Sequence, residues 1–196
     1  MNTIKLSIVR FIFHFIPISR GFSIKRVLLR WCGAKVGGGS KIYSNVKIFG
    51  NGQLVIGEDT FIGHEVMIVT SSPATITLGA RVDIAPNVFI GTGSHQIDWN
   101  RDRVAGTGTS ESIVIEDECW LGVGCKILPG VLVGKHTVIA AAAVVNKSLP
   151  PNIIAAGIPA RVIMNPVKLK SGPGAIPEIQ MNASFHGHSQ CSKHPY

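Results

Sequence analysis

The sequence predicts an all-β solenoid, a parallel β-helix of about five coils with helices before it and a flexible tail after it. An isoleucine, leucine or valine recurs at every sixth residue through most of the chain, usually with a small or branched residue four places later. A period of six fits neither an α-helix, which repeats near 3.6 residues, nor an alternating strand, which repeats at two. It fits a prism with three short faces per turn, in which the first and fifth residues of each hexad point inward.

The repeat divides the 196-residue chain into three parts. Residues 1–34 form a basic, apolar segment that we expect to be helical, and residues 35–164 carry the repeat. Residues 165–196 are polar, rich in Gly and Pro and without period, which is typical of a disordered tail. The fifteen hexads, in triplets, are VGGGSK, IYSNVK, IFGNGQ; IGEDTF, IGHEVM, IVTSSP; LGARVD, IAPNVF, IGTGSH; IEDECW, LGVGCK, ILPGVL; and VGKHTV, IAAAAV, VNKSLP.

The repeat is interrupted three times, always at the third hexad of a triplet. The longest interruption, residues 96–114, is predicted to project as a flexible loop, because it is polar and rich in glycine. Insertions that leave one face of a solenoid often mark its binding face. The step between successive first positions grows to eight from Ile48 to Ile56, to ten from Ile68 to Leu78, and to twenty-five from Ile90 to Ile115.

Three stretches, GTGSHQID, IEDECWLGVGCKILPGVLVGKHTVIAAAAVV and IAAGIPARVI, resemble the hexapeptide-repeat acyltransferases. The similarity covers about residues 30–164 and is strongest to sugar O-acetyltransferases, such as those of maltose, galactosides and polysaccharide biosynthesis. The resemblance implies a left-handed β-helix, a homotrimer, and acetyl-CoA as co-substrate between neighbouring prisms. It also implies transfer of the acetyl group to a sugar hydroxyl, for which we expect a surface-polysaccharide precursor as acceptor.

His95 is the candidate catalytic base. It occupies the sixth, outward place of its hexad, directly before the long insertion. A hydroxyl is a weak nucleophile near neutral pH, whereas imidazole titrates close to that pH. The resemblance implies that Nε2 takes the acceptor's proton during direct attack on the thioester, while a carbonyl or carboxylate holds the other ring nitrogen. The alternative is a histidine that only anchors the loop.

The resemblance also assigns two groups of binding residues. Ala141 would let the pantetheine arm approach the backbone, and Lys147 and Arg161 would face phosphates; packing and ordinary surface exposure are the alternatives. The acceptor is expected to differ from maltose or galactoside, because TSSPAT stands where the related enzymes have carboxylates and amides. The cofactor-binding candidates are Trp120, Ala141, Asn146, Lys147 and Arg161, and the substrate-binding candidates are Glu65, Ser71 and Asp98.

The N-terminal segment is basic and apolar at once. It has no Asp or Glu before Glu58, and IVRFIFHFIPI and FSIKRVLLRW lie between its charges. This pattern predicts peripheral membrane contact through residues 1–30. A helical cap on the first coil and a signal peptide are alternatives, whereas the apolar run is too short to span a bilayer. We expect no nucleic-acid partner, because the basic residues form no known binding motif.

Several other functions are disfavoured. Cys119 and Cys125 fall at inward fifth positions, so no disulfide framework is expected and a cytoplasmic location is favoured. We expect the protein to associate there with the inner face of the membrane. The γ-class carbonic anhydrases share the repeat, but Asn100 stands where they have a zinc histidine, and no metal site is expected. N-acetylation of an amino sugar, serine-type O-acetylation and a non-enzymatic scaffold remain as alternative functions.

Overall fold

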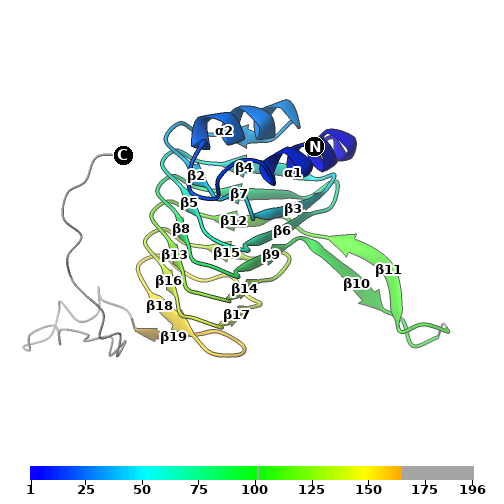
Figure 1. Cartoon of the computed structure of the whole chain (residues 1–196). Helices are drawn as coiled ribbons and strands as arrows, with labels where there is room; N and C mark the ends of the chain where they lie inside the picture. Colours follow the sequence, from blue (N-terminus) through cyan, green and yellow to red (C-terminus); the bar gives the residue numbers. More distant parts are fainter. Residues whose placement is uncertain (101, 165–196) are drawn as a thin grey trace, which may run out of the picture.

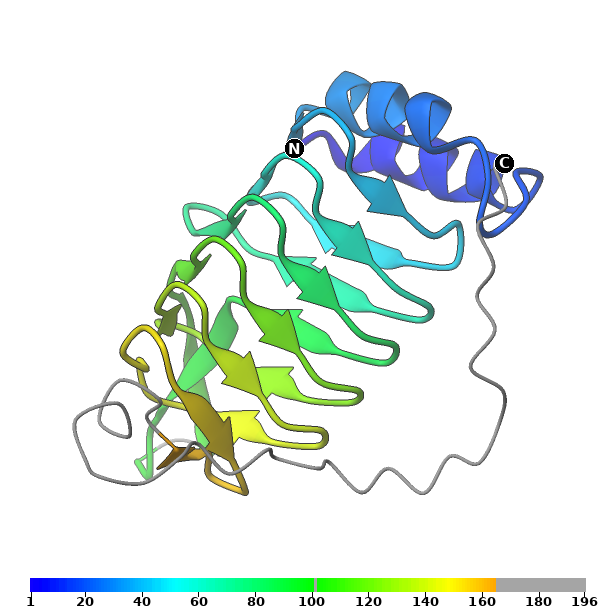
Figure 2. The same ribbon diagram turned by 90° about the vertical axis from the view of Figure 1, so that its left-hand side faces the viewer.

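The fold is a three-sided stack of short strands with two helices across one end (Figures 1 and 2). The computed structural model describes residues 1–100 and 102–164, so the predicted tail lies outside the described residues. Helices α1 (Thr3–Phe13) and α2 (Phe22–Trp31) precede the first coil. The solenoid then winds from β1 (Lys35–Val36) to β19 (Arg161–Met164).

Each face of the prism is one sheet, and successive coils contribute strands that pair in parallel. The first face contains β1, β4 (Gln53–Ile56), β7 (Thr75–Leu78), β12 (Ile113–Ile115) and β15 (Leu132–Val133). The second contains β2 (Lys41–Ile42), β5 (Phe61–Ile62), β8 (Asp83–Ile84), β13 (Trp120–Leu121), β16 (Val138–Ile139), β18 (Ile154–Ala156) and the antiparallel β19. The third contains β3 (Lys47–Gly50), β6 (Met67–Thr70), β9 (Phe89–Gly91), β14 (Lys126–Ile127) and β17 (Val144–Val145).

The predicted inward positions form the core. The first residue of every hexad is buried, and so is the fifth residue of thirteen hexads, Cys119 and Cys125 among them. The prediction is wrong at Ser72 and Ser94, which are exposed. Both belong to hexads that lead into an insertion, and there the third residue, Thr70 or Thr92, is the last to point inward. The backbone N–H of Ser71 donates to Thr92 Oγ1 at 2.9 Å, which ties these two chain exits together.

In ten of the fifteen hexads the fourth residue turns the corner with positive φ. Glycine adopts this conformation without strain, and Asn and Asp tolerate it better than other residues. Gly39, Gly124 and Gly130 follow that preference, but Glu65, Arg81, Glu118, His136 and Ala142 occupy the same position with φ between 53° and 60°. These non-glycine corners therefore carry some backbone strain, and they place side chains on the edges of the prism.

The long insertion is a β-hairpin and not the irregular loop expected from its sequence. Strand β10 (Gly93–Ile97) pairs in antiparallel fashion with β11 (Ala105–Ser110), with His95 opposite Gly108. The hairpin stands away from the prism as an arm (Figure 1). It leaves after β9, and the two shorter insertions follow β3 and β6, so all three leave the third face as predicted. The two strands of the arm satisfy each other's backbone groups through this antiparallel pairing.

The two helices cover the open end of the first coil. Leu6, Val9, Phe13 and Leu29 are buried against it, which protects a sheet edge that would otherwise be free. Lys25 is also fully buried, and its ammonium group donates to the carbonyl oxygens of Pro17 and Ile18 at 3.3 and 2.7 Å. Neither helix is long and apolar enough to cross a bilayer.

Candidate active site

His95 lies near the base of the hairpin with its side chain exposed. Its Nδ1 is 3.0 Å from the carbonyl oxygen of Gly106 on the opposite strand. A carbonyl oxygen only accepts hydrogen bonds, so Nδ1 carries the proton in this contact. In the neutral imidazole, Nε2 is then left with its lone pair free to accept a proton. The hairpin thus selects the tautomer that a general base requires.

A hollow of about 350 Å³ lies beside this imidazole. It is small and polar, with only Gly, Ser, Thr and His on its walls, so it can hold a hydroxyl-bearing group rather than an apolar one. Gly93 and Ser71 lie close together on its wall, since a Cβ on Gly93 would be 3.4 Å from Ser71 Oγ, an ordinary contact distance. The lining residues are Ser71, Ser72, Gly93, Ser94, His95, Gly108, Thr109 and Ser110.

The structure brings Ser71 and His95 together, as the substrate-binding prediction for Ser71 requires. The hairpin residues Ser94, Thr109 and Ser110 were not singled out from the sequence, although GTGSH before the insertion and TGTSES at its end are the signals that contain them. They converge only because the two strands of the arm pair.

Asp98 lies in the arm, beyond the end of β10. Its backbone N–H donates to the Val104 carbonyl at 3.0 Å, and its Oδ1 accepts from the Asn100 N–H at 3.0 Å. These contacts shape the turn at the tip of the arm. Asp98 does not belong to the lining of the hollow beside His95, and its contact with the acceptor stays a prediction.

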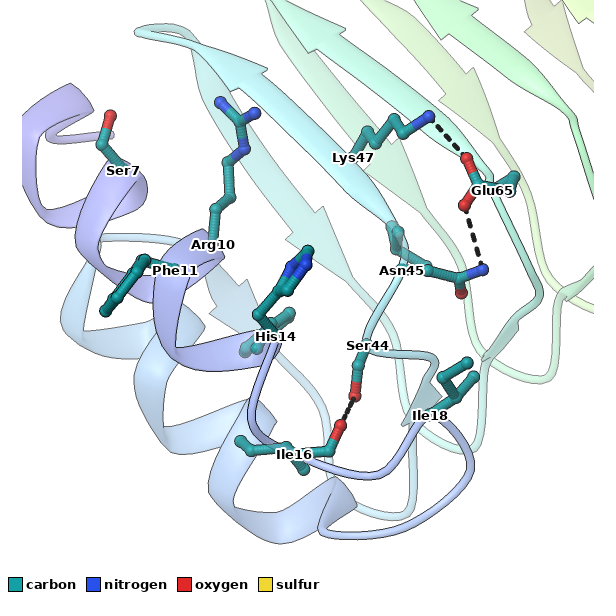
Figure 3. Close-up of a pocket in the computed structure, with 12 residues that line it drawn as sticks. Ser7, Arg10, Phe11, His14, Ile16, Ile18, Ser44, Asn45, Lys47 and Glu65 are labelled. Atoms are coloured by element: carbon teal, nitrogen blue, oxygen red, sulfur yellow. Dashed lines mark hydrogen bonds and ion pairs between the residues drawn. The ribbon is translucent and has the colours of Figure 1, made fainter.

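Glu65 lies at the opposite end of β6 from Ser71 and faces a different cleft, of about 630 Å³, under α1 (Figure 3). Lys47 forms an ion pair with Glu65 at 2.5 Å, and Asn45 Nδ2 donates to the same carboxylate at 3.2 Å. The bond from Lys47 is the main reason that the pKa of Glu65 is lowered. Glu65 and Ser71, both predicted to bind the acceptor, thus line two different cavities of the single chain.

The donor candidates lie along the lower coils. Trp120 is on β13 of the second face with its side chain 43% exposed, and Arg161 is exposed on β19 of the same sheet. Ala141 is exposed at the corner between the second and third faces. These positions suit an extended ligand that ends in phosphates, because the backbone at Ala141 is accessible and the cation of Arg161 is exposed.

Asn146 and Lys147 occupy a different edge. Both are exposed and follow β17, at the edge from which the hairpin leaves two coils earlier. Two strand spacings amount to about 10 Å along the stack. One chain thus presents His95 and Lys147 on one edge, and Trp120, Ala141 and Arg161 on or beside another face.

Two family profiles match the chain. One is described as bacterial transferase hexapeptide (six repeats), over residues 112–147, and the other as hexapeptide repeat of succinyl-transferase, over residues 53–92. Both fall inside the solenoid. They confirm the repeat on either side of the hairpin arm.

Two curated relatives of the chain carry the names of acetyltransferases. A candidate acetyltransferase of Saccharomyces cerevisiae, YJL218W, is 41% identical over 110 residues, which are 56% of this chain and 55% of the relative. The chain thus spans about half the length of this fungal relative. A candidate colanic acid biosynthesis acetyltransferase of Escherichia coli K12, WcaF, is 36% identical over 141 residues, covering 72% of this chain and 74% of WcaF.

A similar solved structure is the hexapeptide-repeat acetyltransferase VCA0836 of Vibrio cholerae, in complex with acetyl coenzyme A. It superposes with a TM-score of 0.65 at 27% identity, over 83% of this chain and 86% of VCA0836. The similarity to WcaF extends over about three quarters of each chain. The chain belongs to the hexapeptide-repeat acyltransferase family.

Proposed function

We propose that the protein is an acetyltransferase that moves an acetyl group from acetyl-CoA to a hydroxyl of a sugar, as part of the synthesis of a surface polysaccharide. The observation that carries this proposal is the imidazole of His95. It is exposed beside a small hollow lined by Ser and Thr, and its Nδ1 is held by a backbone carbonyl. The names of WcaF and of the acetyl-CoA complex of VCA0836 support the same chemistry.

In the proposed reaction, His95 Nε2 accepts the proton of the acceptor hydroxyl as its oxygen attacks the thioester carbonyl carbon. The bond from that carbon to sulfur then breaks, and the proton leaves His95 for the departing thiolate. Gly106 O keeps Nδ1 protonated throughout and stabilises the imidazolium that forms in between. Ser71 and the serines and threonines of the arm would orient the acceptor.

The donor would lie along the lower coils. Ala141 would lie beside the pantetheine arm, and the exposed charges of Lys147 and Arg161 would face its phosphates. Asn146 and Trp120 would complete this surface. In this arrangement the protein supplies position and charge, and coenzyme A supplies the leaving thiol.

The proposed enzyme is a homotrimer. Members of this family are typically trimeric, and the two groups of candidate residues lie on different sides of one prism. A neighbouring prism placed against the arm would bring its second face opposite His95. The active site would then be shared between two chains, and a monomer would lack either the base or most of the donor surface.

We place this enzyme in the cytoplasm, where acetyl-CoA is available. The three cysteines within the described residues, Cys32, Cys119 and Cys125, are free thiols, which suits a reducing compartment. Contact of residues 1–30 with a membrane is a separate proposal and is taken up in the next subsection.

The test is acetyl transfer by His95→Ala. Release of free thiol from acetyl-CoA is measured with a panel of monosaccharides, oligosaccharides and nucleotide-linked sugars as acceptors, and acetyl-CoA binding is measured separately. The turnover number should fall by about 100-fold or more, with donor affinity and melting temperature near those of the wild type. His64→Ala, which removes an exposed histidine on another corner, is the matched control and should retain activity.

Full activity in His95→Ala would refute the assignment of the base. Wild-type protein that binds no acetyl-CoA at all would refute the proposed function. A light-scattering mass of one chain in a fully active sample would contradict the shared site but leave the base intact.

A further inference from the structure

The two helices carry an apolar surface that capping does not explain. At 100° per residue, the exposed Ile4, Ile8 and Phe11 of α1 and Phe15 just after it form one stripe, opposite the buried Leu6, Val9 and Phe13. In α2 the exposed Ile24, Val27 and Trp31 likewise lie opposite the side that buries Lys25 and Leu29. We call these seven exposed residues the outer cap face.

The outer cap face is unusually exposed for its composition. Phe15, Ile4 and Phe11 keep 74%, 73% and 68% of their surface, and Trp31 keeps 48%. Phe11 and Phe15 pack edge to face, with ring centroids 5.2 Å apart, so they form one aromatic cluster. Apolar residues scattered singly over a surface need no explanation, but two continuous stripes on adjacent helices indicate an interaction surface.

The charge around this face identifies its partner. The first 57 residues contain no Asp or Glu, and Arg10, Arg20 and Arg30 are exposed among the apolar residues. Lys5 lies 4.8 Å from the ring centroid of Trp31, which leaves an aromatic ring and an ammonium group side by side. A basic rim around an apolar face, with an aromatic residue between them, is complementary to an anionic bilayer, whose acyl region is apolar and whose surface is negative.

The cleft under α1 adds to this complementarity (Figure 3). Arg10, His14 and Lys47 line it, and apolar walls come from Phe11 and Ile18. Because Arg10 and Phe11 belong to consecutive positions of α1, the cleft opens at the edge of the outer cap face. Lys47 is already paired with the Glu65 carboxylate in this cleft, so Arg10 is the cation that can meet a lipid phosphate beside the apolar wall, with the acyl chains of the lipid remaining in the bilayer.

The position of the helices favours a flat partner. They lie across the end of the solenoid, remote from β18 and β19 at the other end (Figures 1 and 2). In the proposed trimer the prisms would lie side by side, so the three caps would be available at one end of the assembly. Three weak contacts on one surface then act together, which raises the overall affinity without a new contact.

We propose that the outer cap face docks the enzyme on the surface of an anionic membrane. The helices lie in the interface without crossing it, with the apolar stripes among the upper acyl chains and the arginines at the phosphates. The acceptor that this arrangement favours is a sugar carried on a lipid; this last step rests on the proposed function, whereas the docking does not.

The experiment is co-sedimentation of the full chain with vesicles of phosphatidylcholine alone or with one third phosphatidylglycerol. The wild type should pellet with the anionic vesicles, less so at high salt, because surface charges are screened over about 8 Å at physiological ionic strength. Phe11→Ser combined with Phe15→Ser should weaken vesicle binding by about tenfold or more, because two exposed aromatic side chains no longer enter the lipid.

A second variant tests the charge. Arg10→Glu combined with Arg20→Glu should weaken binding to anionic vesicles and leave the weak binding to neutral vesicles unchanged. Ile158→Ser combined with Ile163→Ser is the matched control, since these residues are 76% and 64% exposed at the far end of the solenoid. This control should bind vesicles as the wild type does.

Equal partition of the wild type into the supernatant with both vesicle types would overturn the proposal, and so would equal loss of binding in the far-end control. A change of oligomeric mass in the Phe11 and Phe15 variant, with unchanged vesicle binding, would make the outer cap face a protein interface instead. Acetyl transfer to a water-soluble sugar separates the two proposals: inactive protein that still pellets with anionic vesicles would retain the docking and reject the enzymatic function.

Discussion

Two buried thiols should make the stability of the solenoid depend on pH. Cys119 is 1% exposed and Cys125 is fully buried, and burial raises the pKa of the first thiol to about 11 and of the second to about 12. Both would titrate near 9.0 when the chain is unfolded. Because the unfolded chain releases the thiol protons at a lower pH than the folded chain, the thiols leave the free energy of unfolding unchanged below pH 9. They lower it as the pH rises from 9 toward the folded pKa values.

The magnitude follows from the pKa values. At about pH 10.5 the folded thiols are still protonated, while the unfolded chain has released both protons. Each pH unit above 9 corresponds to about 1.4 kcal/mol per group, so each thiol lowers the free energy of unfolding by about 2 kcal/mol and the pair by about 4 kcal/mol. The double variant Cys119→Ala, Cys125→Ala lacks this loss.

The measurement is urea unfolding, followed by circular dichroism under reducing conditions and at one protein concentration, at pH 8 and at about pH 10.5. Loss of each sulfur leaves a small cavity, which lowers stability by about 1 kcal/mol at both pH values. Val131→Ala is the matched control, because Val131 occupies the same fifth position and is 2% exposed without a titratable group. Its difference from the wild type should not change with pH.

The comparison between variant and wild type carries the test, because other groups titrate in the same range and are common to both chains. Cys32 is buried as well, and burial also raises its pKa. If the wild type and the double variant lose stability in parallel between the two pH values, the two thiols are not protected from water and the reasoning is wrong.

Two further predictions concern the cap and the corners. Lys25 is fully buried, and loss of hydration lowers its pKa from 10.5 to about 8, so between these values the unfolded chain binds one more proton than the folded chain. The free energy of unfolding of the wild type, relative to that of Lys25→Met, should therefore rise by about 3 kcal/mol from pH 8 to about pH 10.5. A difference between the two proteins that stays constant with pH in urea titrations would contradict this. Ala142 has a φ of 58° at a corner where the preceding coil has Gly124 at 68°. Ala142→Gly should therefore raise the free energy of unfolding by about 0.5–1 kcal/mol. Gly124→Ala should lower it by a similar amount through backbone strain alone, because no atom lies within 4 Å of the added methyl group. Thermal unfolding of both variants checks that the two effects have opposite signs.

Much of the fold is local and could therefore be predicted from the sequence. In a solenoid each hexad meets its counterpart in the next coil, so one pattern of inward residues is repeated and is legible as a period. Ile62, Ile84 and Leu121 lie one above another on the second face for this reason. The departure of all three insertions from the third face follows from the same register.

The breaks in the period were harder to predict. Where the chain leaves a face, the register is set by whichever side chain closes the core last, and Thr92 took that place instead of Ser94. The arm became a hairpin because the two polar segments on either side of its turn pair their backbone groups in antiparallel register. Neither outcome follows from hydrophobic spacing.

The sequence by itself determined the β-helix, the inward thiols, the insertion next to His95 and an N-terminus that is both apolar and basic. Only the tertiary structure decided which of these come together. Ser71 and Glu65 are six residues apart in the sequence, yet β6 carries them to opposite ends of one strand, so that Ser71 lies beside His95 and Glu65 lies under α1. It also decided that Lys25 is buried and holds the turn between the helices, whereas Arg10 remains outside. The reason is that strand direction and the packing of one element on another set these distances, and a period along the chain records neither.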